Sequence, residues 1–458
     1  MKEILIVGDG FSAGIFTMHL LQAGFDPSQI SVSGPGHLGH GNAFGCKDKD
    51  FRLNVRAQIM WIKSEERDEF LKWADKEIDD PEAIRTSGNF YRRSDFARFV
   101  NQKFLSTVGF DKVQHFKSKV KKIIRIKNNL TKQISWKAEL ENQKVLNAYN
   151  VVLAIGNPKP EWPCPLDDTI YKSRINLKSH LIENPWTGDW INNVNKEKSV
   201  LFIGSGLTTL DGLTALSGRK YKGQIHVVSS LGKFPPVQAD WEKGTPNIWP
   251  KLKKERLSAS KFIKIHRSHL PNLPPSEPSW QGAWEELRTD LSLNWQSLKQ
   301  LDRKKLKERI GSLWSHFRFR SAPQGIDAVN KFLESKQLFF HKDRVIKLGF
   351  ENGKVKALLS SGKKLWANSI INCSGSGKDK LINQIISDRL ADPDCFGISL
   401  AVNTNHEVLN SSCESRDNQG LYMIGPNTNA SLGDVVAASE VSMQALRLTK
   451  RLKSILNK

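Results

Sequence analysis

The same arrangement of an apolar run, a glycine-rich turn and a helical segment occurs twice in this chain of 458 residues. The first copy begins at residues 4–10 and the second at residues 199–206. In each copy the apolar run predicts a buried strand, and the residues after the turn predict a helix. A second apolar run follows each helix, at residues 30–32 and 225–228, and closes a βαβ unit. The chain is therefore predicted to be an α/β protein with two Rossmann-like units.

The residue types in both turns suit the binding of a dinucleotide. In such a site the first glycine permits a tight turn, the second lets the backbone approach the pyrophosphate, and a small third residue lets helix and strand pack closely. The helix that follows offers its positive N-terminus to the phosphates. One such turn alone is often an ordinary connection, whereas two in the same context predict two dinucleotides. The sets are Gly8, Gly10 and Ala13 in the first unit, and Gly204, Gly206 and Thr208 or Thr209 in the second.

The order of the remaining segments predicts how the chain is divided. Alternating residues near 120–140 predict an antiparallel meander, and a buried strand then ends at Gly156, before a proline-rich break. We expect residues 1–160 to form the first part of one dinucleotide-binding domain and residues 161–365 to form the other. A Trp- and Lys-rich helical insert is predicted at about 238–318. Residues 366–458 are expected to complete the first domain.

Charge and composition narrow the possible partners. The chain has 69 Lys and Arg against 47 Asp and Glu, a formal net charge of +22, so its positive field favours anionic ligands such as phosphate-bearing cofactors. Binding of nucleic acid is not expected, because the basic residues are spread along the chain without a recognisable reader motif. The five cysteines are widely spaced and include no CxxC pair, so they predict no metal site and fit a reducing cytoplasm. No apolar run reaches the ~18 residues of a membrane span.

Several segments together resemble a known family. The chain is similar to the FAD/NAD(P)-binding proteins that include flavin-dependent urate hydroxylase and the nitrosuccinate-forming L-aspartate N-oxygenase, which are distant relatives of ornithine and lysine N-hydroxylases. The shared order of the segments carries this resemblance over nearly the whole chain. The segments are IVGDGFSA at 6–13, LGHGNAFG at 38–45, RLNVRAQIM at 52–60, FLKWA at 70–74, FYRRSDFARFV at 90–100, VVLAIGNP at 151–158, VLFIGSGLTTLD at 200–211, HFRFRSAP at 316–323, INCSGSG at 371–377 and LYMIGPNTNASLGDVVAASE at 421–440.

The resemblance implies a function and a set of cofactor contacts. It implies FAD at the first turn, NAD(P)H at the second, and an FAD-dependent oxidoreductase, most simply a monooxygenase that hydroxylates a small amine or electron-rich molecule. A flavin oxidoreductase that inserts no oxygen and a non-catalytic basic binding protein on the same fold are the alternatives. No catalytic base emerges from the sequence. The implied cofactor contacts are Gly8, Gly10, Ser12, Ala13, Gly39, Gly41, Asn54, Arg56, Val120, Ala154, Gly156, Gly204, Gly206, Leu207, Thr208, Gly425, Pro426 and Gly433.

Two positions depart from the usual pattern. A dinucleotide-binding domain usually ends its second strand with Asp or Glu, which accepts hydrogen bonds from the ribose hydroxyls. This chain has Ser33 and Gly34 there, so Ser33 is expected to supply one weaker contact. After the second unit the family tends to have Arg, which suits the 2′-phosphate of NADPH, whereas this chain offers Lys233.

Other residues have both a functional and a structural interpretation. Arg92 and Arg93 could hold an acidic substrate or be surface charges, and the basic run at 316–320 could bind an anion or face solvent. Asp211 is expected to pack or to cap its helix, and Cys373 to be inert. Three tryptophans of the insert are expected to pack within it, rather than to stack on bases: Trp280, Trp284 and Trp295.

Overall fold

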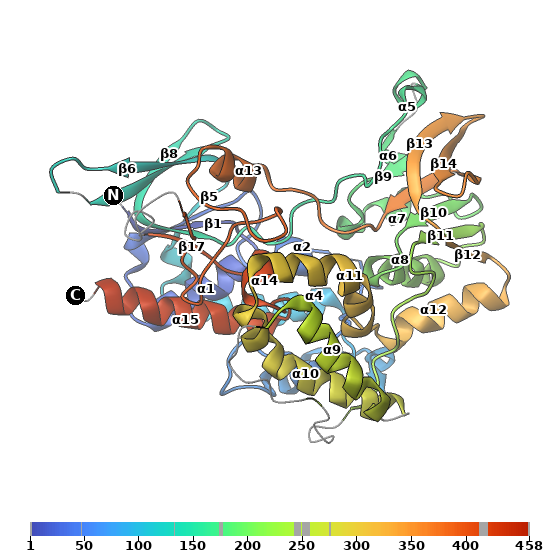
Figure 1. Cartoon of the computed structure of the whole chain (residues 1–458), viewed down its shortest axis with the longest axis horizontal. Helices are drawn as coiled ribbons and strands as arrows, with labels where there is room; N and C mark the ends of the chain where they lie inside the picture. Colours follow the sequence, from blue (N-terminus) through green and yellow to red (C-terminus); the bar gives the residue numbers. More distant parts are fainter. Residues whose placement is uncertain are drawn as a thin grey trace.

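The computed structural model of the chain describes residues 2–46, 48–131, 133–173, 177–241, 249, 257–273, 276–411 and 420–456. Two α/β units lie side by side, and a group of helices lies against both of them in the lower middle of Figure 1. This is the α/β architecture that the two glycine turns predict. Among the described residues, no helix combines the length and the apolar character that crossing a bilayer would need.

A parallel sheet with the order β5-β2-β1-β8-β17 forms the first unit. Its long strand β8 is also the last strand of the antiparallel meander β6-β7-β8, so one strand belongs to both parts. Because β17 comes late in the sequence, the two ends of the chain share this sheet. The strands are β1 (Lys2–Val7), β2 (Ile30–Ser33), β5 (Gln114–Phe116), β6 (Val120–Lys127), β7 (Ile134–Leu140), β8 (Val145–Leu153) and β17 (Leu421–Met423).

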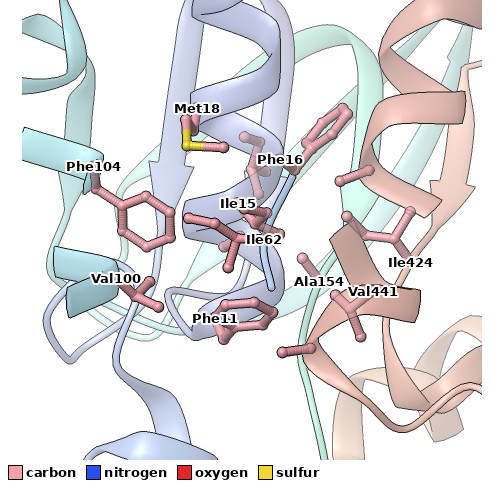
Figure 2. Packing of buried hydrophobic residues seen from close by; sticks show 14 of the residues in the cluster. Phe11, Ile15, Phe16, Met18, Ile62, Val100, Phe104, Ala154, Ile424 and Val441 are labelled. Atoms are coloured by element: carbon pink, nitrogen blue, oxygen red, sulfur yellow. The ribbon is translucent and has the colours of Figure 1, made fainter. Parts of the chain in front are cut away.

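Helix α1 (Phe11–Gln22), which follows the first glycine turn, is buried along most of its length. Helices α4 (Arg93–Leu105) and α15 (Ala438–Leu456) both pack against it. Figure 2 shows Phe104 on one side of α1 and Val441 on the other. The ring of Phe104 comes so near that a Cβ on Gly14 would lie 2.4 Å from it. Close packing on both sides therefore fixes the helix whose first turn faces the predicted cofactor.

The second unit is a parallel sheet with the order β12-β11-β10-β16-β9. Helices α8 (Leu207–Gly218) and α12 (Pro323–Glu334) pack against each other beside it. The second unit extends beyond the predicted boundary at residue 365, because β16 pairs with β10 in the middle of this sheet. A buried apolar strand that ends near glycine does not reveal from its sequence which sheet it joins. The strands are β9 (Leu181–Ile182), β10 (Val200–Ile203), β11 (Ile225–Ser229), β12 (Leu338–Lys342) and β16 (Ser369–Asn372).

Within its described residues, the predicted helical insert forms three α-helices, which share a small hydrophobic core around Phe262 and Leu306. Pro278 lies in the first turn of α10, where its missing N–H costs no hydrogen bond. Pro274 and Pro275, which also prompted the prediction of broken helices, lie outside the described residues, as does Cys413. The helices are α9 (Ala259–His269), α10 (Glu277–Ser297) and α11 (Gln300–Arg318).

Short elements complete the chain. A three-stranded antiparallel sheet, β13-β14-β15, stands between β12 and β16 in sequence. Its strands are β13 (Val345–Glu351), β14 (Lys354–Leu359) and β15 (Lys364–Ala367). The other elements are α2 (Gly41–Phe44), α3 (Glu69–Glu77), β3 (Ile84–Arg85), β4 (Gly88–Asn89), α5 (Asp168–Lys172), α6 (Leu177–His180), α7 (Trp190–Asn193), α13 (Lys380–Ser387) and α14 (Asn429–Leu432).

Candidate dinucleotide sites

The first glycine turn has a backbone that requires glycine. Gly8 has φ +115°, and a Cβ there would lie 2.3 Å from the carbonyl oxygen of Ala154. Gly10 precedes α1 with φ −77° and ψ −169°, and no side chain caps the helix. The backbone N–H groups of the first helical turn are therefore left without a side-chain cap, which is the arrangement that binds phosphate at a helix N-terminus.

The second turn repeats this geometry. Gly204 has φ +108°, and a Cβ there would lie 2.4 Å from the carbonyl oxygen of Cys373. Gly206 precedes α8 with φ −80° and ψ −168°, again with no side-chain cap. A Cβ on Gly206 would meet nothing within 4 Å, so the space above this turn is open. The two turns, which share little sequence beyond their glycines, have nearly the same backbone conformation.

Segments that lie far apart in sequence meet at the first turn. A Cβ on Gly10 would lie 3.4 Å from Cα of Gly41, and a Cβ on Gly425 would lie 2.6 Å from Oγ of Ser12. Gly39 donates its backbone N–H to the carbonyl oxygen of Asp9 at 2.8 Å. The structure thus gathers around this turn the residues that the resemblance implies from both ends of the chain.

Gly156, at the end of the central strand, belongs to the same group. Its carbonyl oxygen accepts a hydrogen bond from Nδ2 of Asn427 at 2.6 Å. Its φ is +66°, and a Cβ there would meet nothing within 4 Å. Pro426 begins the short helical turn that contains Asn427, and Ala13 is buried within α1. A glycine that faces open space at the end of a parallel strand is where α/β proteins bind ligands.

The helical insert covers the C-terminal segment that contains Gly433. Trp295 donates Nε1–H to the carbonyl oxygen of Ala430 at 2.9 Å, and Arg303 donates from Nη1 to that of Ser431 at 3.1 Å. Arg318 forms an ion pair with Asp434. The three contacts hold the insert on α14 and on the segment around Gly433, the glycine that the resemblance implies as a flavin contact.

A small cavity joins the two units. It has a volume of about 20 Å³, room for one water molecule, and it lies between Asn54 of the first unit and Leu207 at the start of α8. Asn54 also donates from Nδ2 to the carbonyl oxygen of Arg320 at 3.5 Å. The predicted flavin contact Asn54 and Leu207, the residue that follows the second glycine turn, therefore line one cavity. The other lining residues are Asp50, Arg52, Leu210, Asp211, Thr214, Ser321, Ala322, Gln324 and Gly325.

Three predicted contacts have structural roles in the protein: two bind other residues and one is buried in the core. Arg56 pairs with the carboxylate of Asp240 and lies over the ring of Trp241, with 4.8 Å from Cζ to the ring centre. Val120 is buried in the core below the first sheet. The proposal that Ser33 supplies a ribose contact is wrong, because its hydroxyl is buried and donates to the carbonyl oxygen of Ser118 at 2.7 Å.

The basic residues offered as anion-binding groups form ion pairs instead. Nη2 of Arg93 lies 2.8 Å from Oδ2 of Asp211, and Nε of Arg92 lies 3.4 Å from Oδ2 of Asp80. Arg320, which is 2% exposed, pairs with Glu285 on α10. Asp211 is therefore neither a cap nor a simple packing residue. Sequence spacing gives no sign of such long-range pairs.

The remaining side chains with alternative interpretations are structural. Burial raises the pKa of the Cys373 thiol to about 12, so it is not a nucleophile at neutral pH. Trp284 packs against Trp314 and Phe317 inside the insert, and Trp280 lies edge-on to the ring of Phe317. Trp280 and Trp284 thus pack within the insert, whereas Trp295 also joins the insert to Ala430.

Comparison with known proteins agrees with this architecture. Residues 5–158 match the model of the FAD-NAD(P)-binding family NAD_binding_9. No curated protein matches the sequence.

Among solved structures, the reduced ornithine hydroxylase PvdA of Pseudomonas aeruginosa has a TM-score of 0.66 and 11% identity, with 100% of each chain covered. The Kutzneria sp. 744 ornithine N-hydroxylase KtzI, described with reduced FAD, NADP⁺ and L-ornithine, has a TM-score of 0.63 and 11% identity, with 100% of each chain covered. The FAD-bound cadaverine monooxygenase DfoA of Erwinia amylovora has a TM-score of 0.64 and 12% identity, with 99% of this chain and 95% of that chain covered. The chain therefore contains an FAD-NAD(P)-binding segment at residues 5–158 and has, over its whole length, the fold of these hydroxylases.

Proposed function

We propose that this protein is an FAD-dependent, NAD(P)H-using monooxygenase that hydroxylates a small amine or electron-rich molecule. The observation that supports it most is the pair of glycine turns with matching backbone conformations, each followed by a helix without a side-chain cap. The two units adjoin, because Asn54 and Leu207 line one cavity. Hydride transfer needs the two cofactor rings to meet, so two dinucleotide sites are useful only where their units adjoin. The fold shared with hydroxylases that bind FAD and NADP⁺ supports the same assignment.

The chain offers groups that fit FAD at the first turn. The uncapped N-terminus of α1 would hold the pyrophosphate, and Gly10 and Gly41 leave room for it because neither has a side chain. Gly156 and Gly425 would border the cofactor on the side of the C-terminal segment. When bound, FAD supplies the redox chemistry, which includes the activation of O₂.

The second turn would hold NAD(P)H. Gly206 and the start of α8 face open space, as a second pyrophosphate needs. Lys233 is exposed just after β11, and its backbone carbonyl accepts a hydrogen bond from Ser205 of the turn at 2.9 Å. A cation at this place favours the 2′-phosphate of NADPH over the bare ribose of NADH.

The chain positions the substrate and excludes water. Arg93 and Arg320, two of the arginines considered as anion-binding groups, are paired with Asp211 and Glu285, so their charges are already compensated within the protein. The contacts of Trp295, Arg303 and Arg318 with residues 430–434 would close the insert over the flavin and keep water out. The net charge of +22 favours a substrate that carries a carboxylate.

Kinship with flavin-dependent urate hydroxylase and L-aspartate N-oxygenase, which the sequence motifs imply, is part of this proposal. A reducing cytoplasm is the expected location, since the four described cysteines, Cys46, Cys164, Cys373 and Cys395, are all free thiols.

The decisive experiment measures NAD(P)H oxidation by flavin-loaded protein over a panel of amino acids and purines, with product masses. A monooxygenase yields product heavier by one oxygen atom and consumes NAD(P)H faster with its substrate. Peroxide without any hydroxylated product would instead identify a flavin oxidoreductase. Colourless protein that takes up no added FAD but is retained on nucleic acid would support the basic binding protein.

A further inference from the structure

The first unit lacks the acid that usually binds the ribose of a dinucleotide. That acid stands at the end of the second strand, where its carboxylate accepts hydrogen bonds from the ribose hydroxyls. Here β2 ends at Ser33, whose hydroxyl is used within the protein, and Gly34 follows. A site built for FAD would therefore leave the adenosine ribose without its usual partner.

The carboxylate of Asp9 lies at this place. Asp9 stands between the two glycines of the first turn, and its Oδ2 accepts a hydrogen bond from the backbone N–H of Gly36. A Cβ on Gly34 would lie 2.5 Å from Cγ of Asp9. Asp9 belongs to the turn after β1, and its side chain extends to the end of β2. Its carboxylate lies next to Gly34, the position at which the usual acid would be attached.

The carboxylate of Asp9 contacts a loop that is itself held in place, and one of its oxygens can still accept a hydrogen bond. The loop after β2 is fixed from the other side, because the carbonyl oxygen of Gly34 lies 3.0 Å from Nε2 of His115 and that of Gly36 lies 2.6 Å from Nζ of Lys117. Within the described part of the chain, Oδ1 of Asp9 has no hydrogen-bond donor, and the residue is only half-buried.

We propose that Asp9 binds the hydroxyl groups of the adenosine ribose of the dinucleotide at the first turn, in place of an acid at the end of β2. This inference rests on the proposed function, which identifies that dinucleotide as FAD. A carboxylate can accept a hydrogen bond on each oxygen, and bonds to a charged acceptor are the stronger kind. Oδ1 is available for one ribose hydroxyl, and Oδ2 can accept from a second hydroxyl beside Gly36 N–H.

The structure has room for an acid at position 9 or at position 34, but not at both. The backbone of Gly34 does not have a positive φ, so an L-residue can adopt it. The three heavy atoms nearest to a Cβ there all belong to Asp9. An acid at position 34 therefore collides with Asp9. It fits once position 9 is glycine, because the Cβ of Asp9 itself would lie 2.6 Å from the new Cβ.

The test measures the dissociation constant of the apoprotein for FAD by the change in flavin fluorescence. Asp9→Ala should raise this constant roughly 10- to 100-fold, as for the loss of one or two hydrogen bonds to a charged group. Gly34→Asp alone should also raise it, because the new side chain displaces Asp9. The double variant Asp9→Gly/Gly34→Asp should bind FAD more tightly than Asp9→Gly or Gly34→Asp alone, because glycine at position 9 removes the three atoms that lie nearest to the new Cβ. Such a non-additive result is expected only of neighbouring groups that replace each other.

Asp26→Ala is the matched control, because Asp26 also accepts a hydrogen bond from a backbone N–H in a turn, that of Ser28 at 2.8 Å. This variant should leave the FAD affinity unchanged. Melting temperatures of the apoproteins show whether each variant folds. Wild-type protein that binds no FAD would overturn the proposed function and this inference together. If the wild type binds FAD, the inference alone is overturned by an unchanged affinity in Asp9→Ala, or by a double variant that binds FAD no more tightly than the better of its two single variants.

Discussion

Nη2 of Arg93 at the start of α4 lies 2.8 Å from Oδ2 of Asp211 on α8, so an ion pair joins the two units close to the second glycine turn. Both side chains are largely buried, with exposed fractions of 21% and 18%. Burial raises the pKa of Asp211 to about 6, against the opposing effect of Arg93. The link between the units therefore changes its charge within the range of pH in which enzymes are studied.

The raised pKa gives Asp211 a defined effect on stability. Its carboxyl holds a proton more tightly in the folded chain than at the unfolded value of 3.8, so its contribution is present at low pH and is lost as the pH rises through about 6. Asp211→Asn removes this titration. The free energy of unfolding of wild type, relative to the variant, should therefore fall by on the order of 1 kcal/mol between pH 5 and pH 7.5.

Urea unfolding at the two pH values measures this difference. Asp327→Asn, at the more exposed ion pair with Arg85, is the control for a lost surface carboxylate. If Asp211→Asn instead loses more stability at pH 7.5 than at pH 5, the attraction of Arg93 outweighs burial, and the pKa of Asp211 is not raised.

The two glycine turns should be separable by mutation. Gly206→Ala places a methyl group in open space, so the fold should tolerate it, but the methyl group would occupy the approach of a pyrophosphate. We expect the KM for NAD(P)H to rise at least about 10-fold, as for the loss of a charge-assisted contact, with an unchanged flavin spectrum. Gly10→Ala, 3.4 Å from Gly41, should instead weaken FAD binding.

Each variant is the control for the other. Steady-state kinetics with added FAD measures the first effect, and flavin fluorescence titration measures the second. Loss of both cofactors in both variants would mean that the substitutions disturb the fold rather than two distinct sites.

The glycine turns could be predicted because their requirement is local. Gly8 and Gly204 need a positive φ and a close approach to a neighbouring strand, and few other residues permit either. Contacts between segments that lie far apart in the sequence produce no such local pattern. Three such contacts depend on how distant segments pack. They are the pairing of β16 with β10, the ion pair of Arg93 with Asp211, and the hydrogen bond between Asp9 and Gly36. The sequence showed that an acid was missing at Gly34, but only the fold shows what stands there.

Lys233 should set the preference between the two nicotinamide cofactors. It follows β11 beside the second turn, and its side chain is exposed. Lys233→Ala should raise the KM for NADPH roughly 3- to 10-fold, as for one exposed charge-assisted contact, and leave that for NADH unchanged. Lys222→Ala, at an exposed surface ion pair in the same unit, is the control. Equal effects on both cofactors would show that Lys233 does not contact the 2′-phosphate.

The ion pair between Arg318 and Asp434 should hold the helical insert on the C-terminal segment. Its two side chains are only 10% and 8% exposed. Removing one partner of a buried pair leaves the other charge without compensation, so Asp434→Asn should lower the free energy of unfolding by about 3 kcal/mol. Breaking the more exposed pair with Asp327→Asn should cost less than about 1 kcal/mol, since solvent screens it.

The same pair should affect the cofactor, because Asp434 follows Gly433, at the place where the insert covers the candidate flavin site. Urea unfolding compares the two variants, and limited proteolysis shows whether the insert is cut faster in Asp434→Asn. Flavin affinity should fall in this variant and stay constant in Asp327→Asn. Equal stability losses with equal flavin affinity would mean that Arg318 and Asp434 do not hold the insert over the site, and that Trp295 and Arg303 suffice.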